Sequence, residues 1–185
     1  MGKKAARPKA KKATPKAKKA TPKVKKASPH VRELDKLEAM LARTTEAEAL
    51  GALAVKFHMV GYMLGHDIPA IINNPGLVGR ATRGKLEAHE RASAAHARAG
   101  NVRHALFHLF EGLDAFPDRA DRERVAERIV AVLDVHAPLV GARLRSELAA
   151  LPVIDDEMDS RQQFYGVVRG IKSAFDWDSL PRGRA

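Results

Sequence analysis

Residues 86–117 read LEAHERASAAHARAGNVRHALFHLFEGLDAFP, and this stretch decides the fold class. Two runs of helix-forming residues, 86–99 and 102–115, flank the turn dipeptide Gly100-Asn101, and a proline follows the second run. The pattern predicts two helices joined by a tight turn. Because no part of the chain alternates apolar and polar residues over the length of a strand, we expect an all-α protein.

The same stretch resembles one unit of the tetratricopeptide repeat, a helical hairpin of about 34 residues with small residues where its helices cross. The positions that carry the resemblance are Gly100 at the turn, Ala105, Leu109 and Gly112 in the second helix, and the closing Pro117. His89 and His96 stand where the first helix of the repeat carries aromatic residues. The resemblance implies a short solenoid-like stack of helical hairpins, and a plain helical bundle is the alternative.

Two further helices are predicted before this hairpin. The first begins with Ser28 as N-cap and Pro29 as first helical residue, and it runs to about residue 42. The second begins at a capping box formed by Thr45 and Glu48 and ends at Gly65. Apolar stripes mark the faces expected to be buried: Leu34, Leu37 and Leu41 in the first helix, and Leu50, Leu53, Phe57, Val60 and Leu64 in the second.

Glycines shape the predictions for the next part of the chain. Gly51 and Gly61 lie inside the second helix, where glycine is unfavourable, so we expect close helix contacts there. Residues 66–81 contain prolines and the turn signal NNPG, and they are predicted to form an irregular loop packed on the body, with room for one helical turn at 70–72. The candidate phosphate contacts in this loop are Gly76, Gly79, Arg80 and Arg83.

The carboxyl-terminal part is predicted to hold a second helical hairpin, over 121–136 and 138–151, and a last helix over 160–174. The last helix has an apolar stripe, and Trp177 is expected to close the core. The acidic residues ahead of this helix are Asp155, Asp156, Glu157 and Asp159, which suit a helix N-terminus. Alternatively, they fold back on the basic amino end and screen it.

The amino end is a separate, basic segment. Residues 11–31 read KKATPKA, KKATPKV and KKASPHV, three consecutive heptads with a proline in each. Up to Arg32 the chain has 13 Lys+Arg and no acidic residue, whereas the rest has 20 basic and 22 acidic residues, so the net charge of +11 belongs to this segment. Like charges, prolines and scarce apolar residues predict a disordered tail over 1–30, ahead of an all-α domain over 31–180.

Such a tail is expected to bind a polyanion such as a nucleic acid. Lysines that neutralise its phosphates release the counterions condensed on it, and this release favours binding. It resembles the Lys/Ala/Pro-rich tails of linker histones and of the bacterial proteins that imitate them, through the units Thr14-Pro15-Lys16 and Thr21-Pro22-Lys23. The resemblance implies DNA binding. The candidate nucleic-acid-binding residues are Lys3, Lys4, Arg7, Lys9, Lys11, Lys12, Lys16, Lys18, Lys19, Lys23, Lys25 and Lys26. The candidate phosphorylation sites are Thr14, Thr21 and Ser28, where a phosphate would weaken the attraction.

We therefore expect a non-sequence-specific, nucleoid-associated DNA-binding protein of the cytoplasm, since nothing in the tail can read base edges. Its ligand would be double-stranded DNA, and its helical domain would bind an unidentified protein or a second copy of itself. A helical adaptor whose tail binds RNA or an acidic protein is the alternative. No membrane-spanning run, cofactor motif or phosphate-binding loop occurs in the sequence, so we expect no membrane association, no cofactor and no enzyme activity.

One set of residues leaves a metal site open. His104, His108 and Glu111 share one helix face, which is how a helix presents metal ligands, and His89 and His96 could face them from the partner helix. This set would support a third hypothesis, a metal-binding helical enzyme. The competing interpretation is that these histidines are solvent-exposed on the outer surface of the hairpin.

Overall fold

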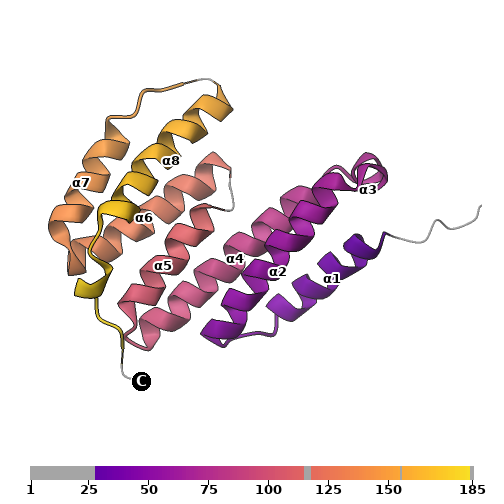
Figure 1. Ribbon diagram of the computed structural model, residues 1–185, viewed down its shortest axis with the longest axis horizontal. Coiled ribbons are helices and arrows are strands. Elements are labelled where there is room, and N and C mark those ends of the chain that lie inside the picture. Colours follow the sequence, from indigo (N-terminus) through magenta and orange to yellow (C-terminus); the bar gives the residue numbers. More distant parts are fainter. Residues whose placement is uncertain (1–27, 115–117, 155, 184–185) are drawn as a thin grey trace, which may run out of the picture.

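The computed structural model describes residues 28–114, 118–154 and 156–183, and their regular structure is entirely helical (Figure 1). The all-α prediction is therefore confirmed. The helices are α1 Pro29–Leu41, α2 Ala47–His66, α3 Ile68–Asn73, α4 Leu77–Arg98, α5 Val102–Leu113, α6 Arg119–His136, α7 Pro138–Ala149 and α8 Glu157–Ala174, followed by the 3-10 turn η1 Trp177–Ser179.

The helices follow one another across the molecule, each packing against its neighbours in sequence (Figure 1). Short connections between α4 and α5 and between α6 and α7 make these pairs antiparallel hairpins, as predicted. Two apolar clusters fill the interior. One cluster is formed by residues of α1, α2, α3 and α4. The other is formed by Leu86 of α4 and by residues of the carboxyl-terminal half of the chain. Helix α4 therefore contributes to both clusters.

Helix α1 begins as the sequence predicts. The hydroxyl of Ser28 accepts a hydrogen bond from the backbone N–H of His30, and Pro29 occupies the first turn. The same hydroxyl donates to Asp67 Oδ2 at 2.5 Å, which ties the start of α1 to the end of α2. The stripe of Leu34, Leu37 and Leu41 is fully buried, so this helix face forms part of the core.

Both ends of α2 differ from those predicted from the sequence. The helix begins at Ala47 with Glu46 as N-cap, and no side chain caps it, so the Thr45 and Glu48 capping box is wrong. Arg91 of α4 donates hydrogen bonds to the backbone carbonyls of Leu41, at the end of α1, and of Thr44 in the connection. Glu46 is extended, so α2 begins only after it. The helix also continues through the predicted stop at Gly65. It ends at His66, with Asp67 as the C-cap. The predicted buried stripe is confirmed at Leu50, Leu53, Phe57, Val60 and Leu64.

The prediction of an irregular loop over residues 66–81 is wrong for most of the segment. Helix α4 begins at Leu77, so most of this segment is helical rather than an irregular loop. Position 84 of α4 holds a glycine, and an added Cβ there would overlap the ring of Phe57. This close contact explains a glycine within a helix. The close contacts predicted at Gly51 and Gly61 are confirmed, since a Cβ on these residues would lie 3.1 Å from the His108 ring and 3.2 Å from Ala81.

The last helix and the turn after it close the carboxyl-terminal cluster. Of the predicted stripe Phe164, Val167, Val168, Ile171 and Phe175, all are buried except Val167, which is half-buried. The Trp177 ring packs edge-on against Phe110 and Phe175, with centroids 5.7 and 5.4 Å apart. The indole N–H donates to the Lys172 carbonyl at 3.0 Å. The expectation that this tryptophan closes the core is confirmed.

Candidate functional site

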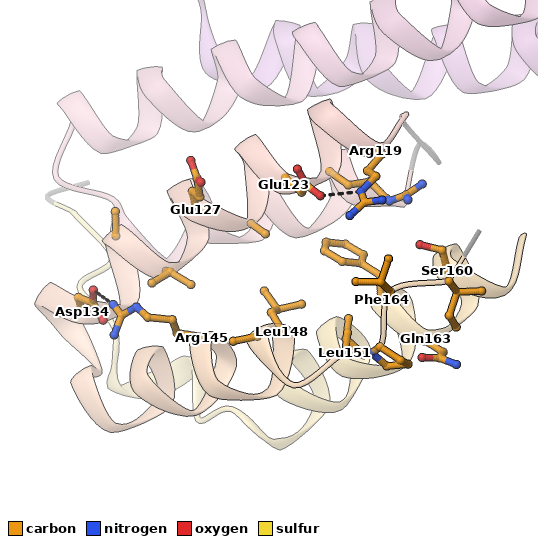
Figure 2. A pocket seen from close by; sticks show the side chains of 18 residues that line it. Arg119, Glu123, Glu127, Asp134, Arg145, Leu148, Leu151, Ser160, Gln163 and Phe164 are labelled. Atoms are coloured by element: carbon orange, nitrogen blue, oxygen red, sulfur yellow. Dashed lines mark hydrogen bonds and ion pairs between the residues drawn. The ribbon is translucent and has the colours of Figure 1, made fainter. Parts of the chain in front are cut away.

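A groove of about 670 Å³ lies between α6, α7, the segment after α7 and the first turns of α8 (Figure 2). Its apolar lining comes from all of these elements: Ala126 and Val130 of α6, Leu148 of α7, Leu151, Val153 and Ile154 of the connecting segment, and Phe164 of α8. Val153 is 87% exposed, so a large apolar side chain stands at the edge of the groove. This combination is typical of a surface that binds an apolar segment of a partner.

The charged rim of the groove is largely paired within the protein (Figure 2). Arg119 Nε donates to Glu123 Oε1 at 2.9 Å, and Arg145 pairs with Asp134. Glu127 adds a further carboxylate on the α6 side. Because the two signs are mixed around an apolar floor, the rim does not select a strongly charged ligand.

A buried arginine fixes the end of the groove near the start of α8. Arg122 of α6 is 2% exposed, and its Nη1 donates to Glu157 Oε1 at 2.7 Å. Its guanidinium also lies over the Phe164 ring, 5.7 Å from the centroid. Hydrogen bonds from Arg122 and then Arg161 lower the pKa of the Glu157 carboxyl. These contacts hold the first turn of α8 against α6 and so determine the width of the groove.

The acidic segment before α8 caps that helix. Asp156 accepts hydrogen bonds from the backbone N–H groups of Met158 and Asp159, which confirms the N-terminal role predicted for this segment. Glu157 pairs with Arg122 within the body. Asp155 lies outside the described residues.

The histidines of the α4–α5 hairpin form a cluster, and three of them are buried. His89, His96 and His108 are 6–8% exposed, so the prediction of histidines on the outer surface is wrong for them. His89 Nδ1 lies 3.1 Å from His108 Nδ1, and His96 stacks on His108 with centroids 5.2 Å apart. Gly51 of α2 lies against the His108 ring, so three helices enclose the cluster.

Burial keeps these imidazoles neutral. Desolvation, then the neighbouring His108 and the cations Lys85 and Lys172, lowers the pKa of His89 to about 3. Desolvation, then His96 and His104, lowers the pKa of His108 to about 4, although Glu111 and Glu48 oppose the shift. A neutral His89–His108 pair can share one hydrogen bond, with one ring donating and the other accepting.

The candidate metal ligands are not brought together as a set. Glu111 forms an ion pair with Lys172 Nζ at 2.6 Å, and exposed His104 is placed by Asn101, whose side-chain oxygen lies 3.0 Å from its Nδ1. Over 28–114, 118–154 and 156–183, no group of three or more His, Asp or Glu residues is arranged to hold a metal ion.

The predicted phosphate contacts near residue 80 lie at the start of α4, and Arg80 is already paired with carboxylates. Arg80 donates to Glu38 Oε1 at 3.0 Å and to Asp35 Oδ1 at 2.7 Å, and these bonds raise the pKa of its guanidinium. Gly76 and Gly79 belong to the cap and first turn of α4, and Arg83 is exposed on the same helix. Two carboxylates of α1 therefore already satisfy the arginine that would have bound a phosphate.

All of the predicted nucleic-acid-binding residues lie outside the described residues, as do Thr14 and Thr21. Ser28 is the exception among the candidate phosphorylation sites, and its hydroxyl is occupied as the N-cap of α1 and as a donor to Asp67. This hydrogen bond lowers the pKa of the Asp67 carboxyl. A phosphate on Ser28 would replace that donor with negative charge beside Asp67.

Most arginines of the helical body form ion pairs with carboxylates of the same body. Among the sixteen arginines in the described ranges, twelve form ion pairs with a carboxylate, and the other four form none with a described residue. Arg124 and Arg128, for example, both pair with Glu90. These neighbouring carboxylates reduce the attraction that the body can exert on a polyanion.

Comparisons with known proteins found no match for this chain: no protein-family model, curated protein or solved structure. Among the described residues, no helix combines the length and apolar character needed to cross a bilayer.

Proposed function

We propose that this protein binds duplex DNA through its lysine-rich tail without reading sequence, while the helical body binds a protein partner. The observation that carries the proposal is the segregation of charge. The tail, residues 1–30, has 12 Lys+Arg and no carboxylate, whereas most body arginines pair with acidic neighbours. The tail's resemblance to linker-histone tails supports the same ligand.

The expected affinity depends on salt. Release of counterions from about eight phosphate contacts gives a slope of roughly −7 for log K against log salt concentration on duplex DNA. The tail has no Phe, Tyr or Trp on which a base could stack and no Asn or Gln to bind base edges. Duplexes of different sequence and equal length should therefore bind with similar affinity.

The test uses the full chain and a variant in which the eleven tail lysines become glutamine. Fluorescence anisotropy with a labelled duplex at several salt concentrations should show that the variant loses both affinity and salt slope. Arg83→Gln with Arg98→Gln is the matched control, because these arginines belong to the body and form no ion pair with a described residue. If the tail variant binds DNA like the wild type, the proposal is wrong. Stronger binding to RNA than to duplex DNA would favour the adaptor alternative.

The α6–α7–α8 groove supports the second part of the proposal. Its apolar floor and mixed-charge rim fit a short partner segment with apolar side chains flanked by charges of both signs. Val153→Glu changes an 87% exposed side chain at the groove edge and should abolish capture of the partner from nuclease-treated lysate without unfolding the protein. Val135→Glu, at an exposed position of α6 outside the groove, should leave capture intact. Equal capture by both variants would exclude the groove as the partner site.

A further inference from the structure

Helix α2 is apolar on two opposite faces, and the described residues cover only one of them. The face carrying Leu50, Leu53, Phe57 and Leu64 is buried against α1 and α4. On the opposite face, Val55 and Tyr62 are each 61% exposed and Met59 is 55% exposed. Large apolar side chains gathered on an exposed helix face are typical of an interaction surface.

The exposed face has the spacing of a coiled-coil seam. Its members are Glu48, Ala52, Val55, Met59, Tyr62 and His66, all exposed and separated alternately by four and three residues. This is the spacing of a and d positions in a heptad, by which one helix packs lengthwise on another. We call these six residues the α2 seam.

We propose that the α2 seam pairs, antiparallel, with the α2 seam of a second copy of this chain. In an antiparallel pair of identical helices, each a position faces a d position of the partner. One register places Val55 against Met59, Ala52 against Tyr62 and Glu48 against His66. Because the pair is symmetric, every contact then occurs twice. Val55 and Met59 are both apolar, and the small Ala52 lies opposite the large Tyr62. The carboxylate of Glu48 lies opposite the imidazole of His66.

The area of the seam is sufficient for a dimer of modest affinity. The exposed parts of its side chains and of the adjacent Met63 offer on the order of 500 Å² per copy, which gives about 1,000 Å² for the pair and meets the lower limit for a specific interface. The basic tail is a poor occupant, because it contains no Phe, Tyr or Trp and no leucine or isoleucine to cover the seam. The inference goes beyond the proposed function and holds whether or not the tail binds DNA.

Sedimentation equilibrium of the full chain tests the pairing. The wild type should shift from the mass of one chain to that of two as its concentration rises through about 10–100 µM. Met59→Glu places a charge in the seam and should raise the dissociation constant by about 100-fold or more. Leu139→Glu, on an 87% exposed residue of α7, should dimerise like the wild type. A wild-type protein that stays monomeric at millimolar concentration, or a Met59→Glu protein that dimerises normally, would overturn the proposal.

Disulfide trapping tests the orientation, since the natural chain contains no cysteine. An oxidised mixture of Val55→Cys and Met59→Cys proteins should give mainly the mixed dimer, because these positions face each other in the antiparallel register. Val55→Cys alone should cross-link poorly, because the two copies of residue 55 are offset along the helices. Efficient cross-linking of Val55→Cys with itself would indicate parallel helices and refute the proposed pairing.

Discussion

Acidification from pH 7 to pH 5 should destabilise this protein through the buried histidine cluster. His89 and His108 are 6% and 8% exposed, and burial lowers the pKa of each well below the ordinary value of about 6.5. In the unfolded chain these imidazoles bind protons as the pH falls below 6.5, whereas in the folded protein they stay neutral until about pH 4 or lower. The unfolded state therefore binds more protons over this interval, and the free energy of unfolding decreases.

The magnitude follows from the size of the two shifts. Below pH 6.5 each such group removes about 1.4 kcal/mol of stability per pH unit, until the pH reaches its folded-state pKa. Between pH 7 and pH 5 the two histidines together should remove about 2–4 kcal/mol, the lower value allowing for their mutual coupling. This loss is a large fraction of the stability of a typical domain.

Urea denaturation followed by circular dichroism, at pH 7, 6 and 5, measures this loss. The double variant His89→Gln/His108→Gln has no titrating imidazole at these positions and should lose less than half as much stability as the wild type over the same interval. His136→Gln, at an exposed position of α6, should keep the wild-type pH dependence. If the double variant and the wild type lose equal stability, the histidine cluster does not cause the acid sensitivity.

Two matched pairs of variants test local features of the fold by chemical denaturation. Gly84→Ala should cost about 1–3 kcal/mol, because the new Cβ would overlap the ring of Phe57. Gly79→Ala, in open space on the same helix, should stabilise by up to about 1 kcal/mol, and equal effects of the two would contradict the packing described. Ser28→Ala should cost about 1 kcal/mol through loss of the N-cap of α1. Thr45→Ala should change stability by less than about 0.5 kcal/mol, and a larger loss would restore the rejected capping box.

The sequence predicts the fold well wherever a local signal acts alone. The leucine stripes of α1 and α2 share a 3.6-residue period with the faces that become buried, and the Ser28-Pro29 pair marks a helix start. The prediction failed over residues 66–81, where the local signals fit two structures. Prolines and turn residues are compatible with a helix start as well as with a loop. Pro69 lies in the first turn of α3, which packs against neighbouring helices, and α4 begins at Leu77 directly after the NNPG turn.

Two features of the candidate sites, the histidine cluster and the groove, were also not predicted from local signals in the sequence. The burial of the histidines could not be predicted, because it depends on α2 lying over the α4–α5 hairpin at Gly51. The groove was also missed, since its lining comes from three helices and the segment after α7. The apolar run Leu151-Pro152-Val153-Ile154 before a polar helix start was the one signal in the sequence that could have indicated it.

We propose that DNA binds to the tail and not to the helical body. The most direct measurement compares the full chain with a chain that starts at Ser28, which keeps the N-cap of α1 and its hydrogen bond to Asp67. Anisotropy with one duplex at about 0.1 M salt, at equal helical content by circular dichroism, should show binding by the full chain and a loss of affinity of at least 100-fold for the shortened chain. Equal affinity of the two folded proteins would contradict the account.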